Sequence, residues 1–161
     1  MKLLPAILLC LVCVKLVVTS PTLAQSPELV VGKARVVDGD TIDIGPKRIR
    51  LWGIDAPEGK QQCEVGGKQY LCGIEATNRL VTFIKTQDVE CLSKTVDRYK
   101  RIVAICRIGK LDLGAEMVRA GWALAFVRYS SDYVAQESEA RMAKRGLWAG
   151  TFQPPWEVRQ R

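Results

Sequence analysis

The chain has 161 residues, enough for one domain with a hydrophobic core and too few for two domains of ordinary size. It contains no histidine, which excludes Ser-His-Asp and Cys-His catalysis and every nuclease mechanism with a histidine base. The 24 Lys and Arg residues exceed the 17 Asp and Glu residues, and the net charge of +7 favours polyanionic partners such as nucleic acid.

Residues 1–24 are predicted to be a signal peptide that precedes a single domain over residues 25–161. Lys2 supplies a basic start, a mostly apolar run follows, and small residues precede the expected cleavage point. The apolar run is short for a spanning helix, and Lys15 interrupts it. An uncleaved N-terminal anchor is the alternative. We therefore expect an exported protein, secreted or periplasmic, with no stable membrane insertion after signal cleavage.

Three strand patterns follow the signal, because β-branched residues and apolar–polar alternation between turn residues are typical of strands. These patterns cover Leu29–Val37, Thr41–Ile44 and Arg48–Ile54. Residues 55–69 are rich in turn formers and are expected to form a loop. A helical apolar stripe then covers Tyr70–Lys85.

The second half of the domain is predicted to hold a β-hairpin and two helices. The hairpin strands are Val89–Val96 and Arg101–Ile108. Asp112 can cap a helix that stops at Gly121. Ser130 or Ser131 can cap a last helix that ends before Gly146. Five strands with three helices in this order suit an α+β, mainly β fold, a closed five-stranded OB barrel, and a generic α+β domain is the looser alternative.

Four cysteines follow the signal, and an even number in an oxidising compartment predicts disulfides. They are Cys63, Cys72, Cys91 and Cys106. If Asp97 opposes Lys100 across a hairpin turn, Cys91 faces Cys106 on the neighbouring strand, within disulfide range. Cys63 and Cys72 would then close a small loop. A metal site on these cysteines is disfavoured, since paired C-x₂-C spacings and histidines are missing.

Acidic residues gather near the first turns of the domain: Asp38, Asp40, Asp55 and Glu58. If the second and third strands pair through Gly45-Pro46, Asp40 lies beside Asp55. Two adjacent carboxylates repel unless a cation joins them, and such hard oxygen ligands suit Ca²⁺ or Mg²⁺. Taken alone, Asp38-Gly39-Asp40 is more typical of a plain turn, and the alternative for Asp55-Ala56-Pro57-Glu58 is a strand end with solvated charge. Together with Arg50, the cluster indicates a functional site.

Three segments of the chain, in this order, closely resemble the signature segments of the staphylococcal nuclease family. They are Asp38-Gly39-Asp40-Thr41, Arg50-Leu51-Trp52-Gly53-Ile54-Asp55-Ala56-Pro57-Glu58 and Asp97-Arg98-Tyr99-Lys100-Arg101. The resemblance extends from about Val30 to Trp148. It implies an OB-fold barrel with three helices, a Ca²⁺ requirement, and cleavage of DNA and RNA with little sequence preference.

The resemblance also implies a set of metal ligands. Carried over position by position, Asp40 and Asp55 would bind Ca²⁺ through their carboxylates and Ala56 through its backbone carbonyl. Family members often have threonine at this last position, and a backbone ligand should survive the change to alanine. Ca²⁺ is therefore the expected cofactor.

The same comparison implies the catalytic residues. Glu58 would orient or deprotonate the attacking water, as a general base. Arg50 and Arg101 would bind the phosphate and neutralise the charge that grows in the transition state, because the guanidinium fork matches phosphate oxygens. Surface salt bridging is the alternative role for two isolated arginines.

Two departures from the family pattern bear on the site. The family usually has glycine where this chain has Lys100, and lysine in a turn that needs a positive φ costs roughly 1 kcal/mol. An alternative is that this turn has a different backbone conformation, which would change the direction in which the Arg101 side chain points. Near the third helix, Tyr129 and Tyr133 occupy the positions where the family stacks a nucleotide, so the resemblance implies that they stack bases. Core packing, or a hydroxyl that anchors the loop, is the alternative for both tyrosines.

The sequence thus predicts an exported, Ca²⁺-dependent endonuclease, a metal-dependent phosphodiesterase that acts on DNA and RNA as a monomer. One alternative is a catalytically inactive nucleic-acid-binding OB module. Another is a secreted toxin or protein-binding domain with a nuclease-like scaffold. Loss of catalysis usually shows as replacement of metal carboxylates, base or arginines, and all five side chains are present here.

Overall fold

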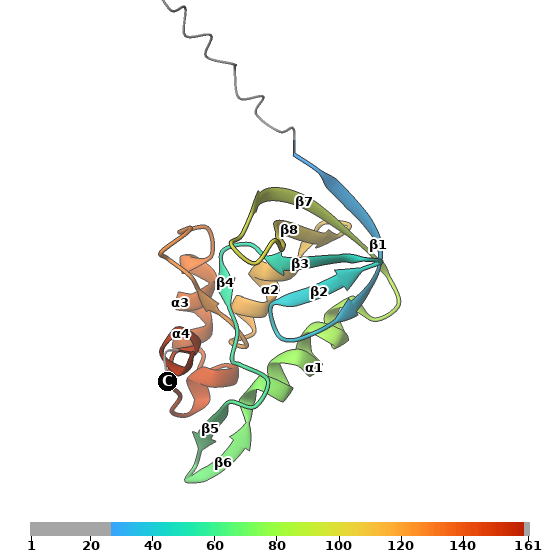
Figure 1. Cartoon of the computed structure of the whole chain (residues 1–161). Coiled ribbons are helices and arrows are strands. Elements are labelled where there is room, and N and C mark those ends of the chain that lie inside the picture. Colours follow the sequence, from blue (N-terminus) through green and yellow to red (C-terminus); the bar gives the residue numbers. More distant parts are fainter. Residues whose placement is uncertain (1–26, 160–161) are drawn as a thin grey trace, which may run out of the picture.

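The computed structural model describes residues 27–159, arranged as a small barrel with helices on one side and at its lower edge (Figure 1). The predicted signal peptide over residues 1–24 lies outside these residues. Within the described part of the chain, every helix is too short or too polar to cross a membrane.

Five strands form the barrel. They are β1 (Leu29–Val36), β2 (Thr41–Ile44), β3 (Lys47–Leu51), β7 (Asp88–Val96) and β8 (Ile102–Ile108). The second half of β1 pairs with β2 and its first half with β7, both antiparallel. Parallel pairing of β3 with β8 closes the sheet into a barrel. The predicted OB-type α+β fold is confirmed.

The barrel interior holds the main hydrophobic core. Ile42 and Ile49, a cross-strand pair of β2 and β3, are fully buried there. Helix α1 (Cys72–Ile84) contributes Leu80 and Ile84, and α2 (Leu113–Arg119) contributes Met117 to the same cluster. Apolar residues at alternate strand positions and at helical spacing meet here, as their periodicity predicts.

The third predicted strand is interrupted. It ends at Leu51, and a turn at Trp52-Gly53 leads into β4 (Ile54–Asp55), which pairs with β10 (Leu124–Ala125) instead of continuing in the barrel. Gly53 has φ +71°, a conformation that glycine adopts without strain. The turn takes Asp55 out of the barrel sheet and places it, fully buried, between Ile54 and Ala56, which line the cleft described below.

The predicted loop over residues 55–69 is wrong in its second half. Its second half, with the first two residues of the predicted helix, forms the hairpin β5 (Gln62–Val65) and β6 (Lys68–Leu71), joined at Gly66-Gly67. The helix therefore begins at Cys72 and not at Tyr70. Both glycines have positive φ, +56° and +76°. A two-residue Gly-Gly connection is a hairpin signal in its own right, and the polar composition of the two short strands masks it.

The remaining helices follow the prediction with one correction. Asp112 in β9 (Leu111–Asp112) caps α2 by accepting a hydrogen bond from Ala115 N at 3.1 Å. Helix α3 (Val134–Met142) begins after Tyr133 with no side-chain cap, so the predicted serine cap is wrong. Ser130 Oγ instead accepts from Asp132 N within the preceding turn. The short η1 (Gly146–Ala149) and α4 (Pro155–Val158) are additional.

The β7–β8 hairpin carries the predicted disulfide between Cys91 and Cys106, which lie opposite each other. The turn is one residue longer than predicted, because Asp97 N bonds to Arg101 O. A bulge between Ser93 and Thr95 restores the register. The two shifts cancel, and the predicted cysteine pairing is confirmed.

The second disulfide joins Cys63 of β5 to Cys72, the first residue of α1. It lies in a separate hydrophobic cluster with the buried Leu124 and Leu147. Partly buried aromatic residues of the C-terminal segment pack on this cluster: Trp148, Phe152 and Trp156. The C-terminal segment is thereby fixed to the domain beside the β5–β6 hairpin.

Candidate active site

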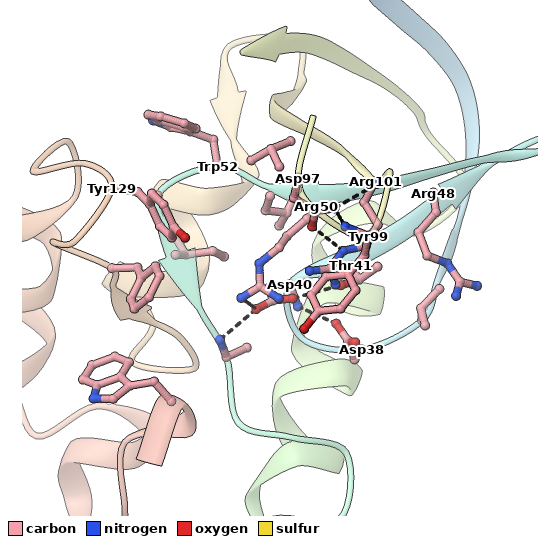
Figure 2. A pocket seen from close by; sticks show the side chains of 18 of the residues that line it. Asp38, Asp40, Thr41, Arg48, Arg50, Trp52, Asp97, Tyr99, Arg101 and Tyr129 are labelled. Atoms are coloured by element: carbon pink, nitrogen blue, oxygen red, sulfur yellow. Dashed lines mark hydrogen bonds and ion pairs between the residues drawn. The ribbon is translucent and has the colours of Figure 1, made fainter. Parts of the chain in front are cut away.

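An open cleft of about 980 Å³ lies where the turn after β1, the end of β3, the β7–β8 turn and the C-terminal segment meet (Figure 2). Its walls come from segments far apart in the sequence, among them residues 37–41, 95–101 and 156–159. All three signature segments contribute residues to the cleft. The predicted site residues Asp40, Arg50, Ala56, Glu58, Arg101 and Tyr129 all line it.

The turn Asp38-Gly39-Asp40 places the first carboxylate of the site. Asp38 Oδ1 accepts a hydrogen bond from Asp40 N at 3.0 Å, which tightens the turn. Gly39 packs closely on the domain, since a Cβ there would lie 2.7 Å from Ala56 Cβ and 2.8 Å from Ala76 Cβ. The missing side chain of Gly39 therefore lets the turn pack against Ala56 and Ala76, and this packing brings Asp40 next to the chain segment after β4.

The carboxylates of Asp40 and Asp55 converge on one guanidinium nitrogen. Arg50 Nη2 lies 2.9 Å from Asp40 Oδ2 and 2.5 Å from Asp55 Oδ1. Thr41 Oγ1 donates to Asp40 Oδ1 at 2.9 Å, and Ala56 N donates to Asp40 Oδ2 at 3.1 Å. Figure 2 shows Arg50 reaching from β3 toward Asp40.

Burial dominates the electrostatics of this carboxylate pair. Asp40 is 3% exposed and Asp55 is fully buried. Burial raises the pKa of Asp40 above its ordinary value, although the charge of Arg50 opposes the shift. Burial likewise raises the pKa of Asp55, opposed by its hydrogen bond with Arg159. In both carboxylates the effect of burial therefore outweighs that of the arginine contacts.

The residues fit a hard, partly hydrated metal ion. Their donors are carboxylate oxygens that converge on a single point, and oxygen donors are those that Ca²⁺ prefers. Among residues 27–159, no cluster of three or more His, Cys, Asp or Glu side chains is close enough to hold a metal ion. A bound ion would therefore keep several water ligands, which leaves positions for a substrate oxygen.

Glu58 lies at the edge of the cleft, three residues after Asp55. Its main chain packs against the first turn of α1, where a Cβ on Gly73 would lie 1.8 Å from Glu58 O. Its carboxylate accepts a hydrogen bond from Arg159 Nη1 at 2.5 Å, and Arg159 Nη2 lies 2.6 Å from Asp55 Oδ2. The side chain of Glu58 is 43% exposed, so water reaches the carboxylate.

Arg101 lines the cleft from the β7–β8 turn and does not contact the carboxylate pair. Asp97 holds it, because Asp97 Oδ2 accepts from Arg101 Nε at 2.7 Å and Oδ1 accepts from Arg101 N at 2.9 Å. Lys100 has φ +64°, so the turn adopts the left-handed conformation that a glycine would adopt. The lysine therefore does not change the shape of the turn.

The two tyrosines of the predicted stacking pair lie in different environments. Tyr129 is 69% exposed and lines the cleft, 5.1 Å from the Phe126 ring. Tyr133 is 5% exposed, and its hydroxyl lies 3.2 Å from both carboxylate oxygens of Asp112. Burial and the neighbouring Asp112 raise the pKa of Tyr133 far above its ordinary value. Tyr133 thus packs inside the domain, away from the cleft.

The C-terminal segment contributes to the cleft, which was not predicted from the sequence. Trp156 and Arg159 line the cleft, and Arg159 contacts two of the predicted site residues. The available signal was the run Pro154-Pro155-Trp156 after the last predicted helix. A tryptophan behind two prolines is more typical of a docked segment than of a free tail.

The domain is thus a closed OB barrel with a carboxylate–arginine cluster in an open cleft. The staphylococcal nuclease homologue family matches residues 48–150 of this chain. The chain belongs to this nuclease family.

Individual relatives agree with this assignment. The chain is 36% identical over 135 residues to an uncharacterized endonuclease of Escherichia coli, covering 79% of this chain and 82% of the relative. It is 33% identical over 144 residues to a micrococcal nuclease of Shigella flexneri, covering 78% of each. It is also 33% identical over 132 residues to the succinoglycan biosynthesis protein ExoI of Rhizobium meliloti (strain 1021), covering 78% of this chain and 68% of that protein.

Proposed function

We propose that this chain is an exported, Ca²⁺-dependent endonuclease that hydrolyses phosphodiester bonds of DNA and RNA with low sequence specificity. The observation that carries the proposal is that the buried carboxylates of Asp40 and Asp55 both contact the same nitrogen, Nη2 of Arg50. The basic net charge and the relatives named as nucleases support nucleic acid as the substrate.

The proposed metal ligands are the carboxylates of Asp40 and Asp55 and the backbone carbonyl of Ala56. When bound there, Ca²⁺ would supply Lewis acidity to a phosphate oxygen and lower the pKa of a bound water. The hydrogen bonds from Thr41 Oγ1 and Ala56 N fix the orientation of Asp40 for this role. Because both carboxylates are buried, their attraction for a cation would be screened less than at an exposed site.

Glu58 is the proposed general base. As the water oxygen bonds to phosphorus, the Glu58 carboxylate takes the water proton, and the phosphorus–oxygen bond to the leaving nucleotide breaks. Glu58 is suited to this role because it lies beside Asp55 and remains open to water at the edge of the cleft. A positioned carboxylate contributes typically 10²–10⁴-fold to such a step.

Arg50 and Arg101 are the proposed phosphate ligands. The carboxylate contacts of Arg50 involve Nη2 alone, and those of Arg101 with Asp97 involve Nε and the backbone N–H. Each guanidinium therefore keeps N–H donors for phosphate oxygens. Their fixed positive charges oppose the negative charge that grows on those oxygens.

The exposed ring of Tyr129 is the proposed stacking surface for a base, since aromatic stacking tolerates every base and suits low specificity. For Tyr133 we propose the anchoring role, because its ring contacts Gly53 and Gly114 and its hydroxyl contacts Asp112. The two disulfides support an oxidising compartment and hence export. We propose that the domain works as a monomer.

The experiment that tests this function is cleavage of plasmid DNA and of a single-stranded RNA by the purified protein. Excess chelator should abolish cleavage, and Ca²⁺ should restore it. Mg²⁺ should restore it poorly, because it demands a smaller and stricter octahedron. Full activity in chelator would overturn the metal assignment, and binding of DNA without cleavage at any metal concentration would favour an inactive binding module.

A further inference from the structure

The C-terminal segment is tied by hydrogen bonds to residues 61–64, which follow Glu58 in the chain. Thr151 and Glu64 exchange two backbone hydrogen bonds, of 2.8 and 2.9 Å. Gln61 Nε2 donates to Gln153 O at 2.8 Å, which ties the segment to the loop that follows Glu58. These contacts fix the path of the chain as it approaches α4.

Helix α4 then places two side chains in the cleft. The Trp156 ring lies 5.6 Å from the Phe126 ring, and Pro155, the first residue of α4, is buried. Arg159 follows the last residue of α4 and points its guanidinium toward the carboxylates. Its reach into the cleft is therefore a consequence of a docked helix, which limits the positions that the guanidinium can take.

The guanidinium of Arg159 joins the proposed base to a proposed metal ligand. Nη1 lies 2.5 Å from Glu58 Oε1, and Nη2 lies 2.6 Å from Asp55 Oδ2. Since the two nitrogens belong to one rigid plane, the two carboxylates are held at a fixed separation. Among the described residues, Arg159 is the hydrogen-bonding partner recorded for the Glu58 carboxylate.

We propose that Arg159 is a positioning residue of this active site, which holds the Glu58 carboxylate beside Asp55 in the orientation that proton transfer requires. This inference rests on the proposed nuclease function. A partly exposed glutamate without a partner samples several rotamers, and the contact with Arg159 selects one of them. The loss of that contact acts on the chemical step, because the base is then misplaced for most of the time.

Arg159 also affects metal binding, and there its effect is unfavourable. Asp55 Oδ1 bonds to Arg50 and Asp55 Oδ2 bonds to Arg159, so both oxygens already face a cation. Arg159 therefore opposes the approach of a divalent ion to Asp55, both by its charge and by occupying an oxygen. Its removal should strengthen Ca²⁺ binding while it weakens catalysis.

The test uses the full mature chain and three variants: Arg159→Ala, Arg159→Lys and Arg35→Ala. Arg35→Ala is the matched control, because it removes the same charge from β1, outside the cleft. We would measure kcat and KM on a short oligonucleotide at saturating Ca²⁺, the Ca²⁺ dissociation constant by calorimetry without substrate, and the melting temperature.

For Arg159→Ala we expect kcat to fall about 10- to 100-fold with KM within about threefold of the parent. The Ca²⁺ dissociation constant should fall at least about threefold, through the lost charge. Arg159→Lys should keep the parent's Ca²⁺ affinity and recover part of kcat, since one ammonium carries the charge but cannot hold both carboxylates as the guanidinium plane does. Arg35→Ala should change neither quantity.

A merely structural role for Arg159 would weaken both Ca²⁺ binding and catalysis in proportion to the loss of folded protein. That outcome, or a kcat within twofold of the parent, or unchanged Ca²⁺ affinity in Arg159→Ala, overturns the inference. If Arg159→Ala does not fold, Arg159→Lys provides the test. A reduced kcat at unchanged Ca²⁺ affinity supports the inference, and a kcat equal to that of the parent overturns it. A parent protein that cleaves no substrate with Ca²⁺ instead overturns the proposed function itself.

Discussion

Arg50 Nη2 lies 2.5 Å from Asp55 Oδ1, although the two residues belong to different strands, β3 and β4, on either side of the Trp52-Gly53 turn. The same nitrogen lies 2.9 Å from Asp40 Oδ2. The charges of Asp40 and Asp55 hold the pKa of Arg50 above its ordinary value, although burial opposes this. The arginine is thus held and charged in the cleft, at the position where we propose that a substrate phosphate binds.

Arg50→Lys should keep the positive charge and lose the planar fork. We expect a barrier higher by about 2–4 kcal/mol for the chemical step, because a lysine cannot contact both carboxylates and a phosphate in the same geometry. Single-turnover cleavage at saturating Ca²⁺ measures this effect. Arg35→Lys is the control and should cleave at the parent's rate, and a similar rate in Arg50→Lys would contradict the assigned role.

Asp97→Asn should loosen Arg101 and reduce stability in a pH-dependent way. Partial burial raises the pKa of Asp97, but hydrogen bonds from the backbone and side chain of Arg101 outweigh it and leave the pKa below its ordinary value. A lowered pKa in the folded state gives stability that is present above the unfolded value and is lost as pH falls through the folded value.

The free energy of unfolding of Asp97→Asn should therefore lie about 1–2 kcal/mol below that of the parent at neutral pH. The difference should shrink toward zero below pH 3.8, the ordinary value of this carboxyl. Urea unfolding of both proteins between pH 3 and pH 7 measures it. A difference that stays constant with pH would show that the carboxylate charge does not hold Arg101.

Lys100→Gly should stabilise the domain. Lys100 has φ +64°, where a Cβ costs about 1 kcal/mol, and glycine removes that cost. Part of the gain is offset by the greater freedom of glycine in the unfolded chain, so we expect a gain of about 0.5 kcal/mol. Lys110→Gly, outside the positive-φ positions, should be slightly destabilising in the same thermal melts. Destabilisation by Lys100→Gly would contradict the assigned turn conformation.

Replacing both Cys91 and Cys106 by alanine should lower stability by about 3 kcal/mol, as the chain-entropy model gives for the 15-residue separation, with a further loss from buried volume. Cleavage at low temperature should remain close to that of the parent, because neither cysteine lines the cleft. Calorimetric melts and the cleavage assay test the two parts separately. Peptide mapping that joined Cys91 to Cys63 or Cys72 would refute the pairing.

The barrel was predictable because its signals are local. Apolar alternation in the first strands, the Asp97–Lys100 turn and the symmetric cysteines indicate the strands and the β7–β8 hairpin, whereas the pairings of β1 with β7 and of β3 with β8 join distant segments. The error in the predicted turn length did not change the predicted cysteine pairing, because the bulge between Ser93 and Thr95 shifts the register back by one residue. The β5–β6 hairpin was missed because its strands are short and polar, and only the turn between them carries a signal.

The site was predictable only where its residues lie in the signature segments. The burial of Tyr133 depends on contacts with Gly53 and Gly114, which no local pattern reveals. The contact between Arg159 and Glu58 spans 101 positions and depends on the packing of Trp156 against the second hydrophobic cluster. Such contacts follow from the assembled fold, and a pattern in the sequence alone does not place them.

Glu58→Gln tests the central claim most directly, because it keeps the size and hydrogen bonding of the side chain and removes its ability to take a proton. Single-turnover cleavage of a short oligonucleotide at saturating Ca²⁺ should slow by roughly 10²–10⁴-fold, while substrate affinity stays within a few-fold. Glu75→Gln, on the exposed face of α1, should cleave as the parent does. A Glu58→Gln rate within a few-fold of the parent, in a protein that melts normally, would contradict the mechanism.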